Sequence, residues 1–261
     1  MGFELLSYSL DDLAQNASLR SPDFEMSSSA KKTAYPIRAI RYWWVCHALV
    51  QELINKPDAT IVDMGAGYGQ MRRYCAGSMP YLSPRYPLDS QSWIGMDKVC
   101  QEGLSTAGYN QVIECDFDKP LPLKDGSVQA LICIHVMEHL PRPEFTVSEI
   151  VRVLAPGGIF CGGSPTAPGP VSYFLHRRLR NKMSKGTTGP NGHINSLSPG
   201  DWKRLVENSG LTLDFMSGSH LMRLSGASLE NSRLWTKLNL FWGGLFPSLG
   251  SEVYLRARKK S

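Results

Sequence analysis

Short apolar runs alternate with segments of helical periodicity through the middle of the chain. Apolar runs that end in a glycine, an acid or a turn are expected to form strands at 59–64, 93–96, 111–115, 128–134 and 159–162. The run 128–134 is nearly all apolar, as expected of a central parallel strand that is buried on both faces. Because a helical or crossover segment follows each of the first four strands, the pattern predicts an α/β fold with a doubly wound parallel sheet.

Apolar residues spaced three and four positions apart predict the helices. The first should begin at Pro36, which suits a first helical turn, and should end at Pro57. In a later helix Ser198 is expected to be the cap and Pro199 to take the first turn. Further helices are expected at 68–77, 99–107, 142–154, 198–209 and 229–246, and further strands at 211–216 and 251–257.

Three segments are predicted to lack regular structure. The polar segment 1–34 is expected to be loosely ordered in parts. Three prolines make 78–92 a loop insertion. The segment 164–195 is long, irregular and rich in basic residues.

Composition places the chain among ordinary globular proteins. It has 261 residues, 42% of them hydrophobic and 20% charged, which suits one large domain or one domain with appendages. A net charge of +5 permits an acidic substrate or a membrane surface and does not require nucleic acid. The 6 cysteines lack metal-ligand spacing, so we expect reduced core thiols and no metal. No signal peptide or membrane span is visible, and a cytoplasmic protein is expected.

The stretch 61–70 has the strongest local pattern. Two β-branched residues lead into Asp63, and glycines follow at positions 65, 67 and 69. Glycine accepts positive φ angles and lets the backbone approach a ligand closely. The pattern predicts a strand that turns tightly into a helix beside a nucleotide-like ligand, although the glycines could also serve the turn alone.

Acidic residues follow the next two strands. Asp97 ends the second strand, where a carboxylate can accept hydrogen bonds from both ribose hydroxyls. Asp116 and Phe117 follow the third strand, and an acid beside an aromatic suits an adenine amino group and ring face. Each acid alone could be a helix N-cap. Three strand ends in a row with fitting chemistry favour an adenosine-containing ligand, because ligands of such sheets lie beyond the carboxyl ends of the strands.

Two later motifs carry a family resemblance. The run 131–140 contains the pair Glu138-His139, and the run 149–158 ends in the turn Arg-Val-Leu-Ala-Pro-Gly-Gly. With the glycine loop and the two acids, they resemble the class I S-adenosylmethionine-dependent methyltransferases of the type 11 group over 59–163. The segment 192–211 is similar to a later part of that family. Gln129 departs from its pattern, which usually has Asp there. The competing dehydrogenase interpretation would require Gly-x-Gly-x-x-Gly, whereas these glycines are spaced by two.

The resemblance implies a Rossmann-like, seven-stranded, mostly parallel sheet with S-adenosyl-L-methionine as cofactor. It implies that the strand 251–257 pairs antiparallel at the sheet edge. The expected organisation is an N-terminal extension and helix over 1–57 and a methyltransferase domain over 58–261, with 164–195 as a lid. The cofactor-binding residues implied are Asp63, Gly65, Ala66, Gly67, Gln70, Asp97, Lys98, Asp116, Phe117, Ile134 and His135.

Catalysis by such a domain mainly requires alignment and desolvation of the reacting groups. A general base is needed only for a weakly acidic acceptor such as a sugar hydroxyl. The candidates are His135, His139 and His193. His139 is expected to be structural, while His135 and His193 are left open between a structural or surface position and a role as base.

The acceptor is suggested by the lid 164–195. There Tyr173, Phe174 and Leu175 precede the basic run 177–182, which suits an acceptor with an apolar part and an acidic group, or an anionic membrane surface. A solvated surface helix is the plain alternative. We therefore expect methylation, most readily at oxygen, of a small-molecule, sugar-linked or lipid-linked acceptor of glycolipid type. N- or C-methylation and a catalytically silent binding or scaffold protein remain alternatives.

Overall fold

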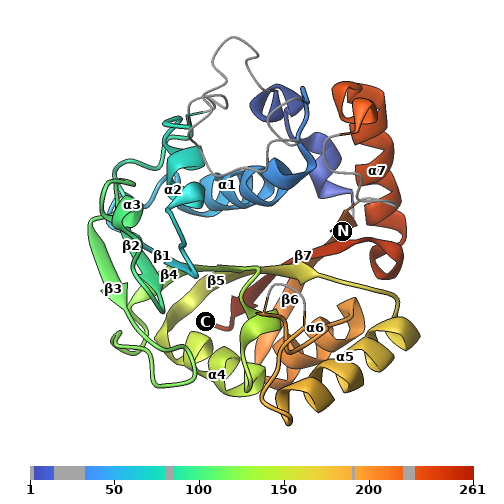
Figure 1. Cartoon of the computed structure of the whole chain (residues 1–261). Coiled ribbons are helices and arrows are strands. Elements are labelled where there is room, and N and C mark those ends of the chain that lie inside the picture. Colours follow the sequence, from blue (N-terminus) through green and yellow to red (C-terminus); the bar gives the residue numbers. More distant parts are fainter. Residues whose placement is uncertain (1–2, 15–32, 80–84, 190–191, 220–226) are drawn as a thin grey trace.

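The computed structural model describes residues 3–14, 33–79, 85–189, 192–219 and 227–261. These residues form a seven-stranded sheet of order β3-β2-β1-β4-β5-β7-β6 (Figure 1). The strands are β1 Thr60–Met64, β2 Ser92–Asp97, β3 Gln111–Glu114, β4 Val128–Ile134, β5 Leu154–Pro165, β6 Leu211–Ser219 and β7 Glu252–Lys259. The pairs among β1 to β5 are parallel, and β7 runs antiparallel to both β5 and β6. This confirms the predicted doubly wound, mostly parallel sheet.

Helices cover both faces of the sheet (Figure 1). On one face lie α1 Ile40–Leu53, α2 Gln70–Cys75 and α7 Arg233–Leu245, and on the other lie α4 Pro143–Val153, α5 Gly169–Met183 and α6 Pro199–Asn208. A short helix, α3 Glu102–Ser105, connects β2 to β3. The 3₁₀ turns are η1 Glu4–Ser7, η2 Leu10–Leu13, η5 Ile37–Ala39, η6 Met137–His139, η8 Ser228–Asn231 and η9 Pro247–Leu249.

Strand β4 shows why its sequence is so apolar. Ala130 and Ile132 belong to the core cluster under α1, while Leu131 and Cys133 belong to the cluster under α4 and α6. Successive side chains of a strand point to opposite faces, so a strand covered on both sides needs apolar residues at every position. Its polar exception, Gln129, accepts a hydrogen bond from the backbone N–H of Thr60 at 2.7 Å through its side-chain oxygen.

The N-terminal segment 3–14 is more ordered than predicted. Leu5, Leu10 and Leu13 are buried in the same core cluster as α1. The expectation of loose order for 15–32 lies outside the described residues. The sequence analysis missed this docking because the segment is short and rich in polar residues, so its few apolar residues do not extend over enough turns to predict a buried element.

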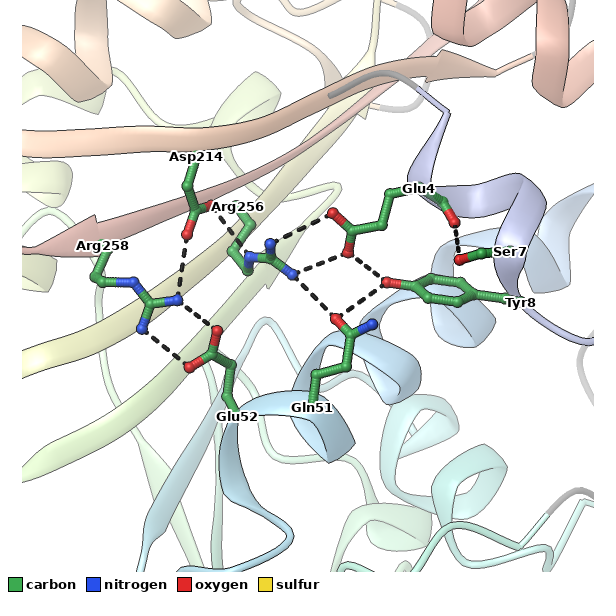
Figure 2. Close-up of polar contacts among 8 residues, drawn as sticks. All are labelled: Glu4, Ser7, Tyr8, Gln51, Glu52, Asp214, Arg256 and Arg258. Atoms are coloured by element: carbon green, nitrogen blue, oxygen red, sulfur yellow. Dashed lines mark hydrogen bonds and ion pairs between the residues drawn. The ribbon is translucent and has the colours of Figure 1, made fainter.

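A polar cluster fastens this segment to the end of the chain (Figure 2). Arg256 on β7 pairs with Glu4 at 3.0 Å and with Asp214 on β6 at 3.1 Å. Arg258, two residues along β7, pairs with Glu52 of α1. The cluster therefore joins η1, α1, β6 and β7 across one edge of the sheet.

Three predictions about elements are wrong. The segment 164–195 is not irregular, because it contains the 15-residue helix α5, which agrees with the alternative of a solvated surface helix. The sequence from Val171 to Met183 has no glycine or proline to break a helix, but its mostly polar composition hid the helical pattern. Strand β7 is antiparallel as implied but is not the edge strand, since β6 lies outside it. Helix α3 has 4 residues, well short of the predicted 99–107.

Other local predictions are confirmed. Ser198 caps α6 in a reciprocal capping box with Asp201. All 6 cysteines are free, and Cys46, Cys75, Cys133 and Cys161 are buried, as expected of reduced core thiols. Across the described ranges, no helix is both long and apolar enough to cross a bilayer.

Candidate active site

The glycine loop joins β1 to α2 at the carboxyl end of the sheet. Its three glycines all have positive φ, +81° at Gly65, +55° at Gly67 and +76° at Gly69, a region that side chains disfavour. The backbone N–H of Gly65 donates to the carbonyl of Met96 at 2.8 Å. A Cβ atom at Gly65 would lie 2.2 Å from the Val136 side chain. The loop is therefore held between the ends of β2 and β4.

Asp97 fixes this loop from the end of β2. Its Oδ2 accepts the backbone N–H of Gly67 at 2.7 Å, and its Oδ1 accepts that of Lys98 at 2.7 Å. The side chain of Lys98 is exposed, so only its backbone takes part. The N-cap residue of α3 is Gln101, so Asp97 is not a cap of that helix. Its carboxylate joins the two strand ends where a nucleotide ligand was predicted.

Asp63 lies beneath the loop as a buried carboxyl. The hydroxyl of Tyr109 donates a hydrogen bond to its Oδ2. Burial raises the pKa of Asp63 to about 6, the hydrogen bond from Tyr109 opposes this rise, and the charge of Asp97 adds to it. Tyr109 was not predicted as a site residue, because a lone tyrosine before a strand carries no signal.

The predicted adenine end follows β3. The Oδ1 atom of Asp116 accepts the backbone N–H of Asp118 at 3.1 Å, which closes a turn. The ring of Phe117 is buried in the core cluster beneath α4 and α6. Neither residue caps a helix, since α4 begins well beyond them.

A cavity of about 280 Å³ opens beside the glycine loop. It is lined by Arg38, Arg41, Tyr42, Asp63, Gly65, Ala66, Gln70, Met71, Ile132, Ile134 and His135. Six of these were predicted as cofactor-binding residues: Asp63, Gly65, Ala66, Gln70, Ile134 and His135. The sequence analysis missed the lining residues from η5 and α1, because Arg38 and Arg41 look like the solvated edge of a core helix.

His135 is buried at the end of β4. Among the described residues it is the one non-glycine with positive φ, at +59°. Its Nδ1 lies 3.4 Å from Glu138 Oε1 and its Nε2 lies 3.3 Å from Glu252 Oε1. Burial alone would lower the pKa of His135, but the two carboxylates outweigh burial and raise it. A histidine that retains its proton in this way is poorly suited to act as a general base near neutral pH.

The other two histidine candidates lie together. The rings of His139 and His193 are 4.9 Å apart between centroids and are nearly perpendicular. A ring nitrogen of His139, a ring nitrogen of His193 and a carboxylate oxygen of Glu138 all lie within 4.8 Å of one another. His139 is exposed, so it does not pack in the core as a structural role would require. Burial lowers the pKa of the partly buried His193. This grouping could not be predicted, because the histidines are far apart in the sequence.

A larger cavity of about 860 Å³ lies among α4, α5 and α6. Its lining includes Glu144, Tyr173, Arg180 and Asp201 and no residue of the glycine loop. The nucleotide prediction therefore concerns the smaller cavity.

Sequence comparison agrees with the geometry. Residues 62–162 match a methyltransferase domain family. The chain is 31% identical to a sterol 24-C-methyltransferase from Gibberella zeae over 118 residues, which are 44% of this chain and 30% of that protein. It is 30% identical to a demethylmenaquinone methyltransferase from Desulfitobacterium hafniense over 133 residues, 49% of this chain and 52% of that protein. The chain thus spans about half or less of these curated relatives.

Structural comparison concerns the fold. A proposed sarcosine dimethylglycine methyltransferase from Galdieria sulphuraria has a TM-score of 0.58 and 16% identity, covering 84% of this chain and 85% of that one. The [4+2]-cyclase SpnF has a TM-score of 0.53 and 14% identity, covering 91% of this chain and 85% of that one. The chain has the Rossmann-like fold of class I methyltransferases. Residues 62–162 match the model of a methyltransferase domain family, which agrees with the resemblance to class I methyltransferases found in the sequence motifs.

Proposed function

We propose that this protein is an S-adenosylmethionine-dependent methyltransferase. The carrying observation is the hydrogen bond from the Gly67 N–H to Asp97 Oδ2, which holds the glycine loop against the end of β2 beside the cavity. At Gly67 a Cβ atom would meet only the side-chain oxygen of Gln70, at 3.4 Å, so the backbone there is open to a ligand. These features fit a nucleoside with an amino-acid tail.

Different residues near the cavity would bind different parts of the cofactor. Asp97 keeps lone pairs that can accept the ribose hydroxyls. Arg38 and Arg41 line the cavity beside Gly65, and their positive charge suits the carboxylate of the methionine part. When bound, S-adenosylmethionine supplies an electrophilic methyl group. Ile134 lines the same cavity and would exclude water from the reacting centre.

The acceptor is inferred from α5. Tyr173 and Phe174 are 63% and 68% exposed, and Arg177 and Arg178 follow one turn later. Exposed aromatic residues beside cations suit an apolar molecule that carries an acidic or hydroxyl group, or an anionic membrane surface. The curated relatives that match this chain include sterol and quinone methyltransferases by name. We therefore infer a lipid-like or sugar-linked acceptor, methylated most readily at oxygen.

The lid 164–195 would bring this surface to the reaction centre. The guanidinium of Arg180 donates to the carbonyl of Pro141 at 3.1 Å, which fastens α5 to the chain just after the Glu138-His139 pair. The segment then returns to His193 beside His139. When no metal ion is bound, His193, partly buried with a lowered pKa, is better suited than His135 to accept a proton from an acceptor hydroxyl.

Two alternatives are kept. N-methylation of a neutral amine would require no base before the methyl transfer, whereas C-methylation would still require a group that takes the proton lost by the acceptor. A silent scaffold or a different reaction is compatible with the fold, because the [4+2]-cyclase SpnF has a similar structure.

Purified protein should be given labelled S-adenosylmethionine with separate quinols, sterols, sugar hydroxyls and acidic lipids. We expect calorimetry to show that the protein binds S-adenosylhomocysteine. We also expect S-adenosylhomocysteine to be formed from S-adenosylmethionine when one of these acceptor classes is present. Binding without turnover on any class would favour the scaffold. Failure to bind either cofactor form would refute the proposal.

A further inference from the structure

The side chain of Glu138 is in an unusual position for a carboxylate. It is 4% exposed, and neither oxygen accepts a hydrogen bond from any described residue. The nearest basic group, His135 Nδ1, lies 3.4 Å from Oε1. A buried carboxylate without hydrogen bonds is costly, and such groups are usually paired or bound to a metal.

The imidazoles of His139 and His193 lie beside Glu138 but do not bond to its carboxylate directly, so only a bound group between the three side chains could connect them. Nitrogen atoms of His139 and His193 and a Glu138 oxygen lie within 4.8 Å of one another, yet no hydrogen bond joins the three side chains within the described ranges. Two nitrogens and one carboxylate oxygen converging on one point form the ligand set of a catalytic zinc site. Magnesium and calcium prefer oxygen ligands alone, so this mixture favours a softer divalent ion.

The backbone holds the two halves of this cluster in register. The carbonyl of Glu138 accepts the N–H groups of Ile194 at 2.9 Å and Asn195 at 3.0 Å. The side-chain amide of Asn195 donates to the carbonyls of Met137, at 3.1 Å, and Leu140. The residues on both sides of the Glu138-His139 pair are thus tied to the residues after His193. Such an arrangement places ligands from distant parts of the chain without requiring a metal for folding.

We propose that Glu138, His139 and His193 form a binding site for a Zn²⁺-like divalent ion. Zinc bonds of about 2.0–2.2 Å place tetrahedral ligand atoms roughly 3.4 Å apart. The three donors reach this spacing by rotation of His139, whose exposed ring is free to turn toward Glu138. Three protein ligands leave a fourth position open on the solvent side for water or for an oxygen of a bound molecule. His135 would orient Glu138 from behind, as outer partners of metal ligands do.

Metal binding can be tested without any acceptor, so the result is independent of the proposed methyl transfer. Full-length protein freed of metal by a chelator would be titrated with Co²⁺, whose visible absorption reports nitrogen and oxygen ligation, and with Zn²⁺ against a chelating dye. One equivalent should bind per chain. Loss of an outer partner costs about 10–100-fold in affinity, so loss of a ligand in H139A or H193A should cost at least about a hundredfold.

Glu138→Gln tests the buried ligand, and His176→Ala is the matched control because that partly exposed histidine lies on α5, outside the cluster. The control should bind as the wild type does. If Glu138→Gln proves unstable, H139A still tests the site, because it removes an exposed side chain and should keep the fold. Unfolding curves of H139A would verify this. Absence of saturable binding, or equal affinity in H139A, H193A and the wild type, would overturn the proposal.

Discussion

At the residue scale, the carboxylate of Asp97 makes three hydrogen bonds within the protein itself. Its Oδ2 accepts the backbone N–H of Gly67, and its Oδ1 accepts those of Lys98 and, at 3.5 Å, Val99. The same side chain therefore shapes the loop and, in the proposed function, also accepts the ribose hydroxyls of the cofactor. Substitutions at Asp97 should report on both roles.

Asp97→Ala should lower cofactor affinity by one to two orders of magnitude. Losing hydrogen bonds to a charged group costs about 1.5–3 kcal/mol, and about 1.4 kcal/mol corresponds to a factor of ten. Calorimetry with S-adenosylhomocysteine measures the change. Asp97→Asn keeps one oxygen acceptor and should lose less. An unchanged affinity in a folded Asp97→Ala protein would remove this residue from the site.

Asp63 gives a prediction about pH. Its folded-state pKa, about 6, lies above the ordinary value of 3.8, so the folded protein keeps this proton where the unfolded chain loses it. Stability should therefore fall as pH rises from about 4 to 6, by up to about 3 kcal/mol from this group alone. Asp63→Asn has no such proton to lose. Urea unfolding at pH 4 and pH 7.5 should show the variant gaining relative to the wild type, and a constant difference would contradict this.

At the scale of elements, the glycines of the tight β1–α2 turn could serve the turn conformation, cofactor binding or both, and substitutions can distinguish these roles. Gly67→Val should abolish cofactor binding while much of the fold survives, because Gly67 has open space where Gly65 meets Val136. Gly126 has a similar φ of +63° and nothing within 4 Å of its Cβ position, so Gly126→Val is a matched control for backbone strain alone. Calorimetry and thermal unfolding compare the two. Normal binding by Gly67→Val would mean that the glycines serve only the turn.

Helix α5 is exposed along most of its length, with only Ser172 buried. Replacing Arg177 and Arg178 by Ser should weaken binding to anionic vesicles by about thirtyfold, since each basic residue near such a surface contributes about 1 kcal/mol. It should raise the acceptor KM and leave cofactor affinity nearly unchanged. Arg180 is kept because it bonds Pro141. Lys203→Ser, on the exposed side of α6, is the control. Equal vesicle binding at low and high salt would exclude a contact through this helix.

Element prediction succeeded where periodicity and turn chemistry agreed. Strand β4 and helix α6 follow their predicted limits closely, because β4 is apolar at every position except Gln129 and α6 begins with a strong cap. Helix α5 was expected only as an alternative, a solvated surface helix, since its residues are mostly polar and only Ser172 is buried. The cluster of Glu138 with His139 and His193 was missed, because it depends on which loops meet at the carboxyl edge, and a sequence read along its length does not show this.

At the scale of the whole molecule, Arg256 connects the first described residues to the last strand. It is 12% exposed and pairs with Glu4 and Asp214. Arg256→Ala should lower the free energy of unfolding by about 1.5–3 kcal/mol, the usual contribution of hydrogen bonds to charged groups, because Glu4 loses its cation while Asp214 keeps Arg258 at 3.3 Å. Arg85→Ala, which breaks an exposed pair with Asp89, should have a much smaller effect, because such pairs are screened by solvent and Asp89 keeps Arg72. Urea unfolding compares them, and a double-mutant cycle with Glu4→Ala isolates the N-terminal link. Equal losses in the two arginine variants would show that the N-terminal segment docks by its leucines alone.

The position of β7 has a consequence for how the protein is made. This strand inserts between β5 and β6, and its first residue, Glu252, faces His135 across the sheet edge. A growing polypeptide on the ribosome presents the glycine loop and β4 long before Glu252 exists. Until the strand arrives, His135 lacks one of its two carboxylates and the edge of β5 remains open to other chains. Translation that stops shortly before residue 252 would therefore leave the glycine loop beside an incomplete carboxyl edge of the sheet, with an aggregation-prone strand exposed.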